Sequence, residues 1–408
     1  MAVDRGAEPM SILVQKFGGT SVSTAAAREH VVRHIERERQ RHQLVVVVSA
    51  MGRSGDPYAT DSLLALAGGG QGLTPRERDL LLCCGEIISA TTLCSLLAER
   101  GIEAVVLTGG QAGIITDEHH GQAQIIRMDT AAVLRELQRG KVVIVAGFQG
   151  RTESGEWTTL GRGGSDTSAT ALGAALGAVR ADIYTDVDGI LTADPRLVAD
   201  ARPLRHVGYA EMCNLARQGA KVIHPRAVEI AAQANLPLRV RSTFLEEEGT
   251  LVSGPLPTAV QDRYVTGIAH VCGITQLSVQ ARDEEGDMQL RVFRAMAGNG
   301  ISVDFINVTP GGAVYTVFDS DAPRALAVLR SIGYEPQAVH GCAKVSVIGG
   351  GMNGVPGIMA SIVEALTGNG ITILQSADSN STIWVLVREE EMAAALRSLH
   401  EKFKLHLP

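Results

Sequence analysis

One stretch of the chain, Thr159-Leu-Gly-Arg-Gly-Gly-Ser-Asp-Thr-Ser-Ala-Thr170, gathers residue types that suit an anionic ligand. Three glycines within four positions let the backbone approach a ligand with no Cβ in the way. Their amides, followed by the start of a small-residue helix, are typical of an anion site. Arg162 stands among the glycines Gly161, Gly163 and Gly164, and its planar guanidinium suits a carboxylate or a phosphate.

Ser165 and Asp166 follow these glycines at the expected start of the helix. Both residue types are favoured as helix caps, so capping alone is one interpretation. Capping does not explain an arginine beside three glycines, and we therefore favour a ligand site.

Lys16 is a second candidate, because it ends a predicted strand beside Gly18 and Gly19. A lysine at that place, with backbone amides beyond it, can neutralise phosphoryl charge. The alternative is an ordinary solvated lysine. The chain has no G-x-x-x-x-G-K-[ST] motif, so it is not a P-loop enzyme.

The segment from Tyr184 to Arg196 contains three aspartates and an arginine just after another predicted strand. It suits the edge of a nucleotide site, although Asp-Gly and Asp-Pro are also ordinary turn formers. Lys221 is either a second phosphate cation or a surface lysine. Glu86 lies on an apolar helix and is either a helix-surface residue or a buried carboxylate, paired with a substrate ammonium or with Lys16.

The elements that position these residues alternate between strands and helices. We expect strands near 12–17, 44–49, 104–108, 141–147, 181–186 and 238–242, with helices near 25–41, 76–100, 131–138 and 209–234. This order predicts a mostly parallel sheet covered by helices on both faces, with ligands at the carboxyl ends of the strands. Lys16, Ser49, Thr108, Gly147 and Asp186 lie at or near such ends and are expected to converge.

The last third of the chain contains a repeat. Arg294–Val303 matches Glu364–Ile373 seventy positions later, and in each copy a helix runs into Gly-Asn-Gly and then a strand. Each copy is expected to be a small β-α-β-β-α unit of the split-βαβ kind. The stretch from Leu245 to Thr258 is a plausible linker.

Size and composition limit the function. A chain of 408 residues supports more than one domain, and its net charge of −7 argues against a nucleic-acid-binding surface. We find no apolar run expected to span a bilayer and no signal-peptide core. The six cysteines show no metal spacing and are expected to be free thiols in a reducing cytoplasm. Met1 and Met10 are both candidates for the residue at which translation starts.

The motifs Lys16–Val22, Gly161–Ser168, Tyr184–Gly189 with Ala193–Arg196, and Gly219–Lys221 together resemble those of aspartate kinases, and the two C-terminal repeats resemble ACT domains. The resemblance covers nearly the whole chain from Ile12. It implies an amino-acid kinase fold, a mostly parallel sheet sandwiched by helices, followed by two ferredoxin-like ACT domains. The implied division is a catalytic domain at 10–244, a linker at 245–262 and ACT-like domains at 263–339 and 340–408. The implied reaction is transfer of phosphate from ATP, with Mg²⁺, to the 4-carboxylate of L-aspartate, the first step towards lysine, threonine, methionine and diaminopimelate.

The resemblance also assigns roles to single residues. Lys16 would hold the transferring phosphoryl group, and Asp166 would orient the substrate or the metal-phosphate. Aspartate would be bound by Ser49, Thr60, Glu86, Arg162 and Ser165. The ATP site would be lined by Lys16, Gly18, Gly19, Thr185, Asp186, Ile190, Leu191, Thr192, Ala193, Asp194, Arg196 and Lys221. No residue is assigned as a protein ligand of a metal.

An amino-acid effector is expected between paired ACT units, at Asp283, Gly286, Asp304 and Asn307, in a homo-oligomer that is at least a dimer. The longer loop at 53–60 and the stretches Gln375–Ser379 and Thr382–Val387 are most like the diaminopimelate-sensitive bacterial isozymes; lysine and threonine are the alternatives. An internally initiated regulatory subunit is left open. Two other functions compete: a kinase acting on glutamate, acetylglutamate or a nucleoside monophosphate, and a non-catalytic amino-acid sensor.

Overall fold

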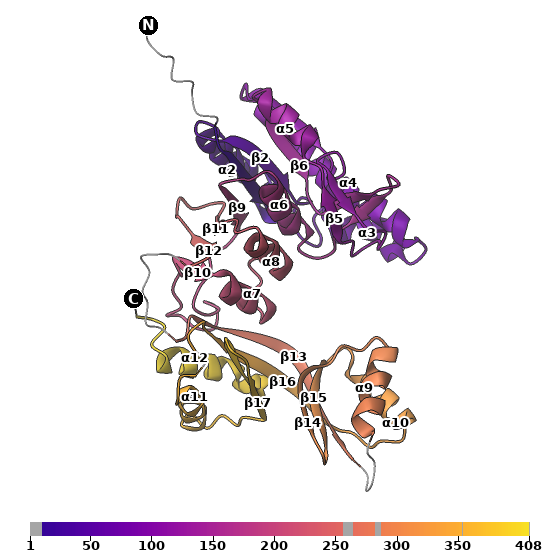
Figure 1. The fold of residues 1–408 in the computed structure, drawn as a ribbon, viewed down its shortest axis with the longest axis vertical. Helices are drawn as coiled ribbons and strands as arrows, with labels where there is room; N and C mark the ends of the chain where they lie inside the picture. The colour runs from indigo at the N-terminus through magenta and orange to yellow at the C-terminus, as the bar shows by residue number, and fades with distance from the viewer. Residues whose placement is uncertain (1–9, 256–263, 282–286, 353, 408) are drawn as a thin grey trace. The chain divides into compact units, whose positions relative to one another are not determined.

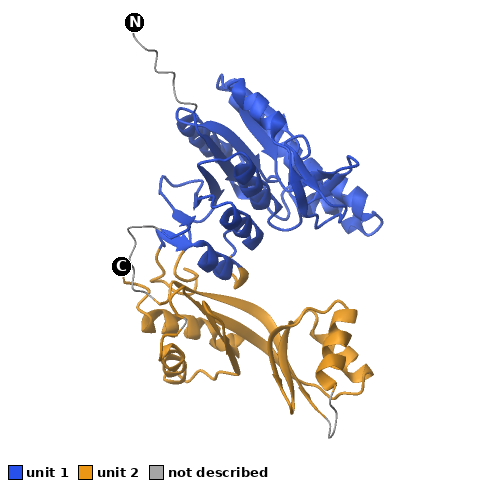
Figure 2. Ribbon diagram, viewed as in Figure 1, with its two compact units in different colours: residues 1–190, 203–216, 221–260 blue, residues 191–202, 217–220, 261–408 orange. Residues whose placement is uncertain are grey.

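The computed structural model describes residues 10–255, 264–281, 287–352 and 354–407. Two compact units divide the chain, and Figure 2 colours them separately. The first contains residues 1–190, 203–216 and 221–260; the second contains 191–202, 217–220 and 261–408. Each is described by itself.

The first unit is built on an eight-stranded sheet with the order β10-β12-β11-β9-β1-β2-β6-β3 (Figure 1). The central pairs β11–β9, β9–β1, β1–β2, β2–β6 and β6–β3 are parallel, and β11–β12 is antiparallel. The predicted mostly parallel sheet is therefore confirmed. The strands are β1 (Ile12–Phe17), β2 (Gln43–Val48), β3 (Ala104–Leu107), β6 (Val142–Ala146), β9 (Arg180–Thr185), β10 (His206–Gly208), β11 (Leu238–Ser242) and β12 (Thr250–Ser253).

Helices cover both faces of this sheet. Side chains of α2 and α4 pack on one face against Leu13, Val46 and Ile144. Gly173 of α6 lies close to Val14 and Ala181, on the opposite face. Because side chains alternate along a strand, Lys16 shares the α6 face with Val14. The helices are α1 (Gly19–Val22), α2 (Ala25–Glu38), α3 (Thr60–Leu66), α4 (Pro75–Glu99), α5 (Ala131–Gln138), α6 (Gly164–Ala175), α7 (Tyr209–Arg217) and α8 (Pro225–Gln233), with a 3-10 turn at Gly68–Gly70.

A second, four-stranded sheet was missed by the sequence analysis. Its order is β5-β4-β7-β8, with β4 (Ile114–Thr116), β5 (Ile125–Met128), β7 (Gln149–Thr152) and β8 (Trp157–Thr159). These strands are three or four residues long, too short for a clear period-two pattern. The sheet matters for the site, because β8 runs directly into the glycine-rich stretch.

The helix α4 also departs from the sequence analysis. Of the described helices it alone is long and apolar enough to cross a bilayer by length and composition, so the expectation that no such segment exists was wrong. A core helix passes the same test. In the structure α4 contacts β3, β6 and β8, and it carries the buried acids Asp79 and Glu86.

The second unit is built on one antiparallel sheet shared by the two repeats, with the order β14-β15-β13-β16-β18-β17. The long strands β13 (Gly267–Gln280) and β16 (Gln337–Ile348) pair along both halves of their length. Each repeat supplies two helices, as predicted. The remaining elements are α9 (Met288–Gly298), β14 (Asp304–Thr309), β15 (Gly312–Phe318), α10 (Ala322–Ser331), α11 (Ile358–Thr367), β17 (Gln375–Asp378), β18 (Thr382–Arg388), a 3-10 turn at Glu389–Glu391 and α12 (Met392–Lys402).

The segment 191–202 belongs to this second unit, although the sequence analysis placed it in the domain 10–244 and assigned part of it to a nucleotide site. Ala193 and Val198 are part of the core formed by α11, α12 and β16. The Thr192 hydroxyl lies 2.9 Å from His400 Nε2, and Arg202 Nε donates to the Leu405 carbonyl at 2.8 Å. Residues 191–202 are therefore built into the second unit.

Candidate active site

The carboxyl ends of the central strands meet at one edge of the first unit's sheet. The amide of Gly18 donates to the Tyr184 carbonyl at 3.3 Å, and that of Ser49 donates to Phe17 at 3.1 Å. The Gly147 amide donates to Val48 at 3.0 Å. The ends of β9, β1, β2 and β6 are thus joined by their backbones, as the sequence analysis predicted. Thr108 follows β3, which is the outermost strand on that side.

Lys16 and Asp166 form an ion pair at this edge, with 2.8 Å between Nζ and Oδ1. Their side chains are only 12% and 11% exposed. The second carboxylate oxygen of Asp166 accepts from the His224 amide at 3.2 Å. Two opposite charges, largely shielded from water, therefore face each other where the substrate groups are expected.

Glu86 reaches the same edge from α4. Its Oε1 accepts from the Ala50 amide at 3.0 Å, just beyond β2, while its buried Oε2 has no hydrogen-bond partner among the described residues. Burial raises the pKa of the Glu86 carboxyl to about 8, and the Ala50 hydrogen bond opposes this only in part. Of the alternatives left open by the sequence, a helix-surface residue and a partner of Lys16 are both wrong. Glu86 is a buried carboxyl with one oxygen unused.

The glycine turn, which we define as Thr159–Gly164, enters α6 in a conformation that requires glycine. Gly163 has φ of 68°, and a Cβ there would lie 2.2 Å from His224. Gly163 is itself the N-cap of α6 and no side chain caps this helix. The interpretation of Ser165 and Asp166 as cap residues is therefore wrong: they lie in the first turn.

The side chains on and after this turn differ in their surroundings. Ser165 is buried, and its Oγ lies against Gly147 at the end of β6. Arg162 is exposed, and its guanidinium makes no hydrogen bond or ion pair with the described residues. Ser49 and Thr60 are half-buried, Thr60 being the first residue of α3. Arg162 is thus the side chain of the turn that is available to a ligand.

Gly18 and Gly19 make close backbone approaches. A Cβ on Gly19 would lie 2.4 Å from the Gly52 carbonyl oxygen, and one on Gly18 would lie 3.4 Å from Lys16 Nζ. The Gly52 amide donates to the Gly19 carbonyl at 2.9 Å. The two glycines therefore let the loop after β2 pack against the lysine end of β1.

The candidate nucleotide residues divide between the units. In the first unit, Asp186 pairs with Arg53, and the Ile190 amide donates to Thr250 Oγ1 at 2.8 Å. Lys221 is exposed and unpaired among the described residues. In the second unit, Arg196 binds Asp194 through Nε at 3.0 Å and a terminal nitrogen at 2.6 Å. These hydrogen bonds hold the pKa of Asp194 below its usual value.

The candidate effector residues are only partly described. Asp304, at the start of β14, pairs with Lys344 of β16, whose side chain is buried. Asn307 is exposed on the edge strand β14. Asp283 and Gly286 lie outside the described residues.

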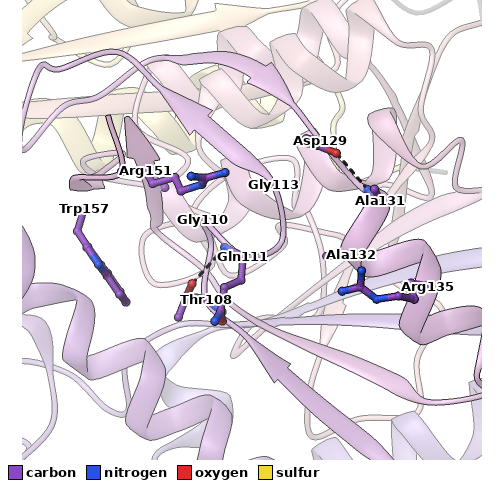
Figure 3. A pocket seen from close by; sticks show the side chains of 12 residues that line it. Thr108, Gly110, Gln111, Gly113, Asp129, Ala131, Ala132, Arg135, Arg151 and Trp157 are labelled. Atoms are coloured by element: carbon purple, nitrogen blue, oxygen red, sulfur yellow. Dashed lines mark hydrogen bonds between the residues drawn. The ribbon is translucent and has the colours of Figure 1, made fainter. Parts of the chain in front are cut away.

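A hollow of about 490 Å³ lies beside β7, β8 and the start of α5 (Figure 3), and neither Lys16 nor Asp166 lines it. Thr108, Arg135, Arg151 and Trp157 are among the side chains that line it. It includes none of the assigned substrate or nucleotide residues. The candidate site lies instead at the sheet edge, where the shielded Lys16–Asp166 pair and the unused Glu86 oxygen are found.

Sequence analysis missed two residues that support the glycine turn. Asp79 is fully buried on α4, and it accepts hydrogen bonds from His120 and Thr159. Arg226, near the start of α8, donates to the Leu160 carbonyl within the turn and to the Ala123 carbonyl in the loop before β5. Asp79 stands seven residues before Glu86 on the same apolar helix, and an acid at such a place was the signal available in the sequence.

The residues at the edge fit Mg²⁺ bound mainly through phosphates. No cluster of three or more His, Cys, Asp or Glu side chains that could hold a metal occurs in the described part of the chain. Asp166 is a single carboxylate beside the lysine expected to contact phosphate. Mg²⁺ usually binds with one or two carboxylates, substrate phosphates and water, so this donor set suits it.

Comparison with known proteins identifies two matching families along the chain. Residues 11–242 match the amino acid kinase family, and residues 337–401 match the ACT domain. Aspartokinase 1 of Bacillus subtilis is 53% identical over 402 residues, which cover 97% of this chain and all of the relative. The aspartokinase of Geobacillus stearothermophilus is 43% identical over 404 residues, 97% of this chain and 98% of that one.

A solved structure is similar over the same length. The crystal structure of E. coli aspartokinase III in complex with aspartate and ADP (R-state) is 25% identical, with a TM-score of 0.78. It covers 96% of this chain and 99% of that one. The expected fold class and activity are thereby confirmed: the chain belongs to the amino acid kinase family and, within it, to the aspartokinases that carry an ACT regulatory region.

Proposed function

We propose that Lys16 and Asp166 form the centre at which the terminal phosphate of ATP meets the 4-carboxylate of L-aspartate. The observation that carries this proposal is their shielded ion pair at the carboxyl ends of β1 and β9. An arriving phosphate would attract Lys16 away from Asp166. Asp166 would then be free to hold a cation that accompanies the nucleotide.

This chemistry requires cancellation of charge more than proton transfer. The nucleophile, a carboxylate, is already ionised at neutral pH, and the difficulty is to bring one anion against another. Positioned cations and backbone amides lower this barrier. Lys16, Arg162 and Lys221 supply the cations. The backbone at Gly18–Gly19 and the glycine turn supply the amides. His224 has a structural place, because its Nδ1 accepts from the Arg226 amide at the start of α8.

Aspartate binding is assigned to the residues around this pair. Arg162 would bind one carboxylate, since its guanidinium is exposed and uncommitted. Glu86 would receive the ammonium group, which explains a buried carboxyl with one oxygen unused. Ser49, Thr60 and Ser165 would complete the site with hydroxyl groups.

The nucleotide is assigned to a longer stretch of chain. Gly18, Gly19 and Lys221 would lie near the phosphates, and Thr185 and Asp186 near the base and ribose. Arg196 would release Asp194 and bind a phosphate of the nucleotide instead. The rest of this lining is Ile190, Leu191, Thr192, Ala193 and Asp194. Mg²⁺, when bound with the nucleotide through Asp166, would neutralise phosphate charge.

Regulation is assigned to the second unit. We infer an amino-acid effector bound near Asp304 and Asn307 in a homo-oligomer paired through its ACT units, with diaminopimelate as the first candidate and lysine or threonine as alternatives. The crystal structure of E. coli aspartokinase III with lysine and aspartate is described as a T-state, which supports an amino acid as the class of effector. The same proposal divides the chain into four parts, with borders after residues 244, 262 and 339. It also includes a cytoplasmic location, to which six free cysteines are suited.

Product formation with different acceptors tests the catalytic assignment. Purified protein with ATP, Mg²⁺ and hydroxylamine should yield the hydroxamate of aspartate and none with glutamate or acetylglutamate as acceptor. A nucleoside monophosphate should not stimulate the formation of ADP. Arg162→Ala should raise the KM for aspartate more than that for ATP. An effect confined to ATP would show that Arg162 is wrongly placed.

A further inference from the structure

Two charged residues outside the assigned site hold the glycine turn in place. Asp79 comes from α4 and Arg226 from α8, 147 positions apart in the sequence. The proposed reaction gives neither of them a role. Both direct their hydrogen bonds to the turn Thr159–Gly164 and to the loop before β5.

Asp79 is fully buried and uses both oxygens on this task. Its Oδ1 accepts from the Thr159 hydroxyl at 2.6 Å. Its Oδ2 accepts from the Thr159 amide at 3.1 Å and from the Gly121 amide at 3.0 Å, and it lies 2.9 Å from His120 Nδ1. A buried carboxylate satisfied by several donors is a rigid anchor, because releasing it would leave a charge unpaired.

Arg226 bridges the same two segments from the other side. One terminal nitrogen donates to the Leu160 carbonyl and the other to the Ala123 carbonyl, each at 3.1 Å. The Ala123 amide in turn donates to the Thr159 carbonyl at 2.9 Å. Because a guanidinium is a planar fork, it can hold two carbonyls at a fixed separation, which an ammonium group cannot do.

The result is a turn whose backbone is held from two sides while one charged side chain stays free. Thr159 and Leu160 are hydrogen-bonded to Asp79 and Arg226, and Gly163 is packed against His224. Arg162 lies between these anchors, exposed and unbonded to the described residues.

We propose that Asp79 and Arg226 are positioning residues that set the place of Arg162 and thereby the affinity for the substrate carboxylate. The proposal rests on the assigned role of Arg162. A binding group displaced by about 1 Å can lose a large part of its effect. Loosening the turn should therefore weaken aspartate binding while leaving the nucleotide largely unaffected.

Steady-state kinetics of the full-length protein tests this. Arg226→Lys keeps the charge and removes the fork, and Asp79→Asn keeps the shape and removes acceptors. Each should raise the KM for aspartate about tenfold, with the KM for ATP and kcat within about twofold of the parent. Arg78→Lys and Asp182→Asn are the matched controls: Arg78 donates to the Gly70 carbonyl, and Asp182 is a buried carboxylate paired with Arg180. Both controls should leave the KM for aspartate unchanged.

A double-mutant cycle separates positioning from general destabilisation. In an Arg162→Ala background, Arg226→Lys should add little to the KM for aspartate, because the group that it positions is gone. An undiminished tenfold effect in that background, or no effect in the folded single variants, would overturn the proposal. If Arg162→Ala itself leaves aspartate binding intact, the assigned role of Arg162 fails instead. Should Asp79→Asn not fold, Thr159→Val, which removes one hydrogen bond to Asp79, takes its place with the same criteria.

Discussion

At the scale of single residues, the pairing of Lys16 with Asp166 governs what the site can do before a substrate arrives. Each side chain is nearly withdrawn from water, so removing one partner leaves the other charge shielded and unpaired. The pair also places a cation on the α6 face of β1, where a phosphate can replace a carboxylate as its partner.

Lys16→Ala should therefore lower kcat by about a hundredfold or more, because a positioned charge on the transferring group is lost. Lys141→Ala is the control, since Lys141 pairs with Glu136 at the start of β6, away from the carboxyl ends. Rates measured at saturating ATP and aspartate decide the matter. Unchanged turnover in Lys16→Ala would remove this lysine from the site.

Glu86 leads to a prediction about protons. With a pKa of about 8 it is largely protonated at pH 7 in the substrate-free protein, and an incoming ammonium should make it ionise. Aspartate binding at pH 7 should then release up to about one proton. Calorimetric titrations in buffers of different ionisation enthalpy measure this number. Glu86→Gln should abolish the release, and an equal release in both proteins would contradict the assignment.

The same carboxyl affects stability with a definite sign. Its pKa is raised in the folded state, so the folded protein binds more protons than the unfolded chain between about pH 4.5 and 8. The free energy of unfolding should fall as the pH rises through this window. In Glu86→Gln this part of the decline should be absent, as denaturant titrations at pH 5, 6.5 and 8 would show.

At the scale of elements, the glycine turn shows why some positions tolerate no side chain. Gly163→Ala has to place a Cβ 2.2 Å from His224 with φ of 68°. Gly177→Ala is its control, with φ of 61° and open space around the site. The control should lose about 1 kcal/mol from the unfavourable φ. Gly163→Ala should lose more stability than the control, measured by thermal unfolding, and most of its activity, measured as turnover. Equal losses in the two variants would show that the contact with His224 is unimportant.

The central elements were predictable because their patterns are long. The apolar run at β2 and the helix at Ala131–Gln138 were found within a residue or two, since burial on both faces or one helical face shows directly in the sequence. The sheet β5-β4-β7-β8 was not found, because its strands are too short to show alternation. The segment predicted as one helix at 209–234 is two, α7 and α8, separated by Gln218–His224.

The candidate site was predictable where glycine and charge occur together, as at Gly161–Asp166. Asp79 and Arg226 could not be found in the same way. Their partners are backbone amides and carbonyls of segments far away in the sequence, and a backbone group leaves no mark in the residue type.

At the scale of the whole molecule, regulation requires that a ligand of the second unit change the rate in the first. The Asp304–Lys344 pair links β14 of the first repeat to β16. If Asp304 contacts the effector, Asp304→Ala should raise the concentration of amino acid needed for half-inhibition by about 5- to 150-fold. Uninhibited kcat should not change.

Activity titrated with diaminopimelate, lysine and threonine, singly and in pairs, measures this effect. Asp321→Ala is the control, because Asp321 pairs with Arg324 on the helix side of the same repeat. Equal sensitivity of parent and Asp304→Ala to the active effector would show that the effector binds elsewhere.

The paired long strands have a consequence for how the second unit can be divided. The first part of β13, Gly267–Val271, hydrogen-bonds to the last part of β16, and the reverse holds for Gln276–Ser278 and Gln337–Val339. Each copy therefore completes its own sheet with the end of a strand from its sibling. The two copies therefore depend on each other, and a cut at their sequence border would yield two incomplete fragments instead of two independent folds.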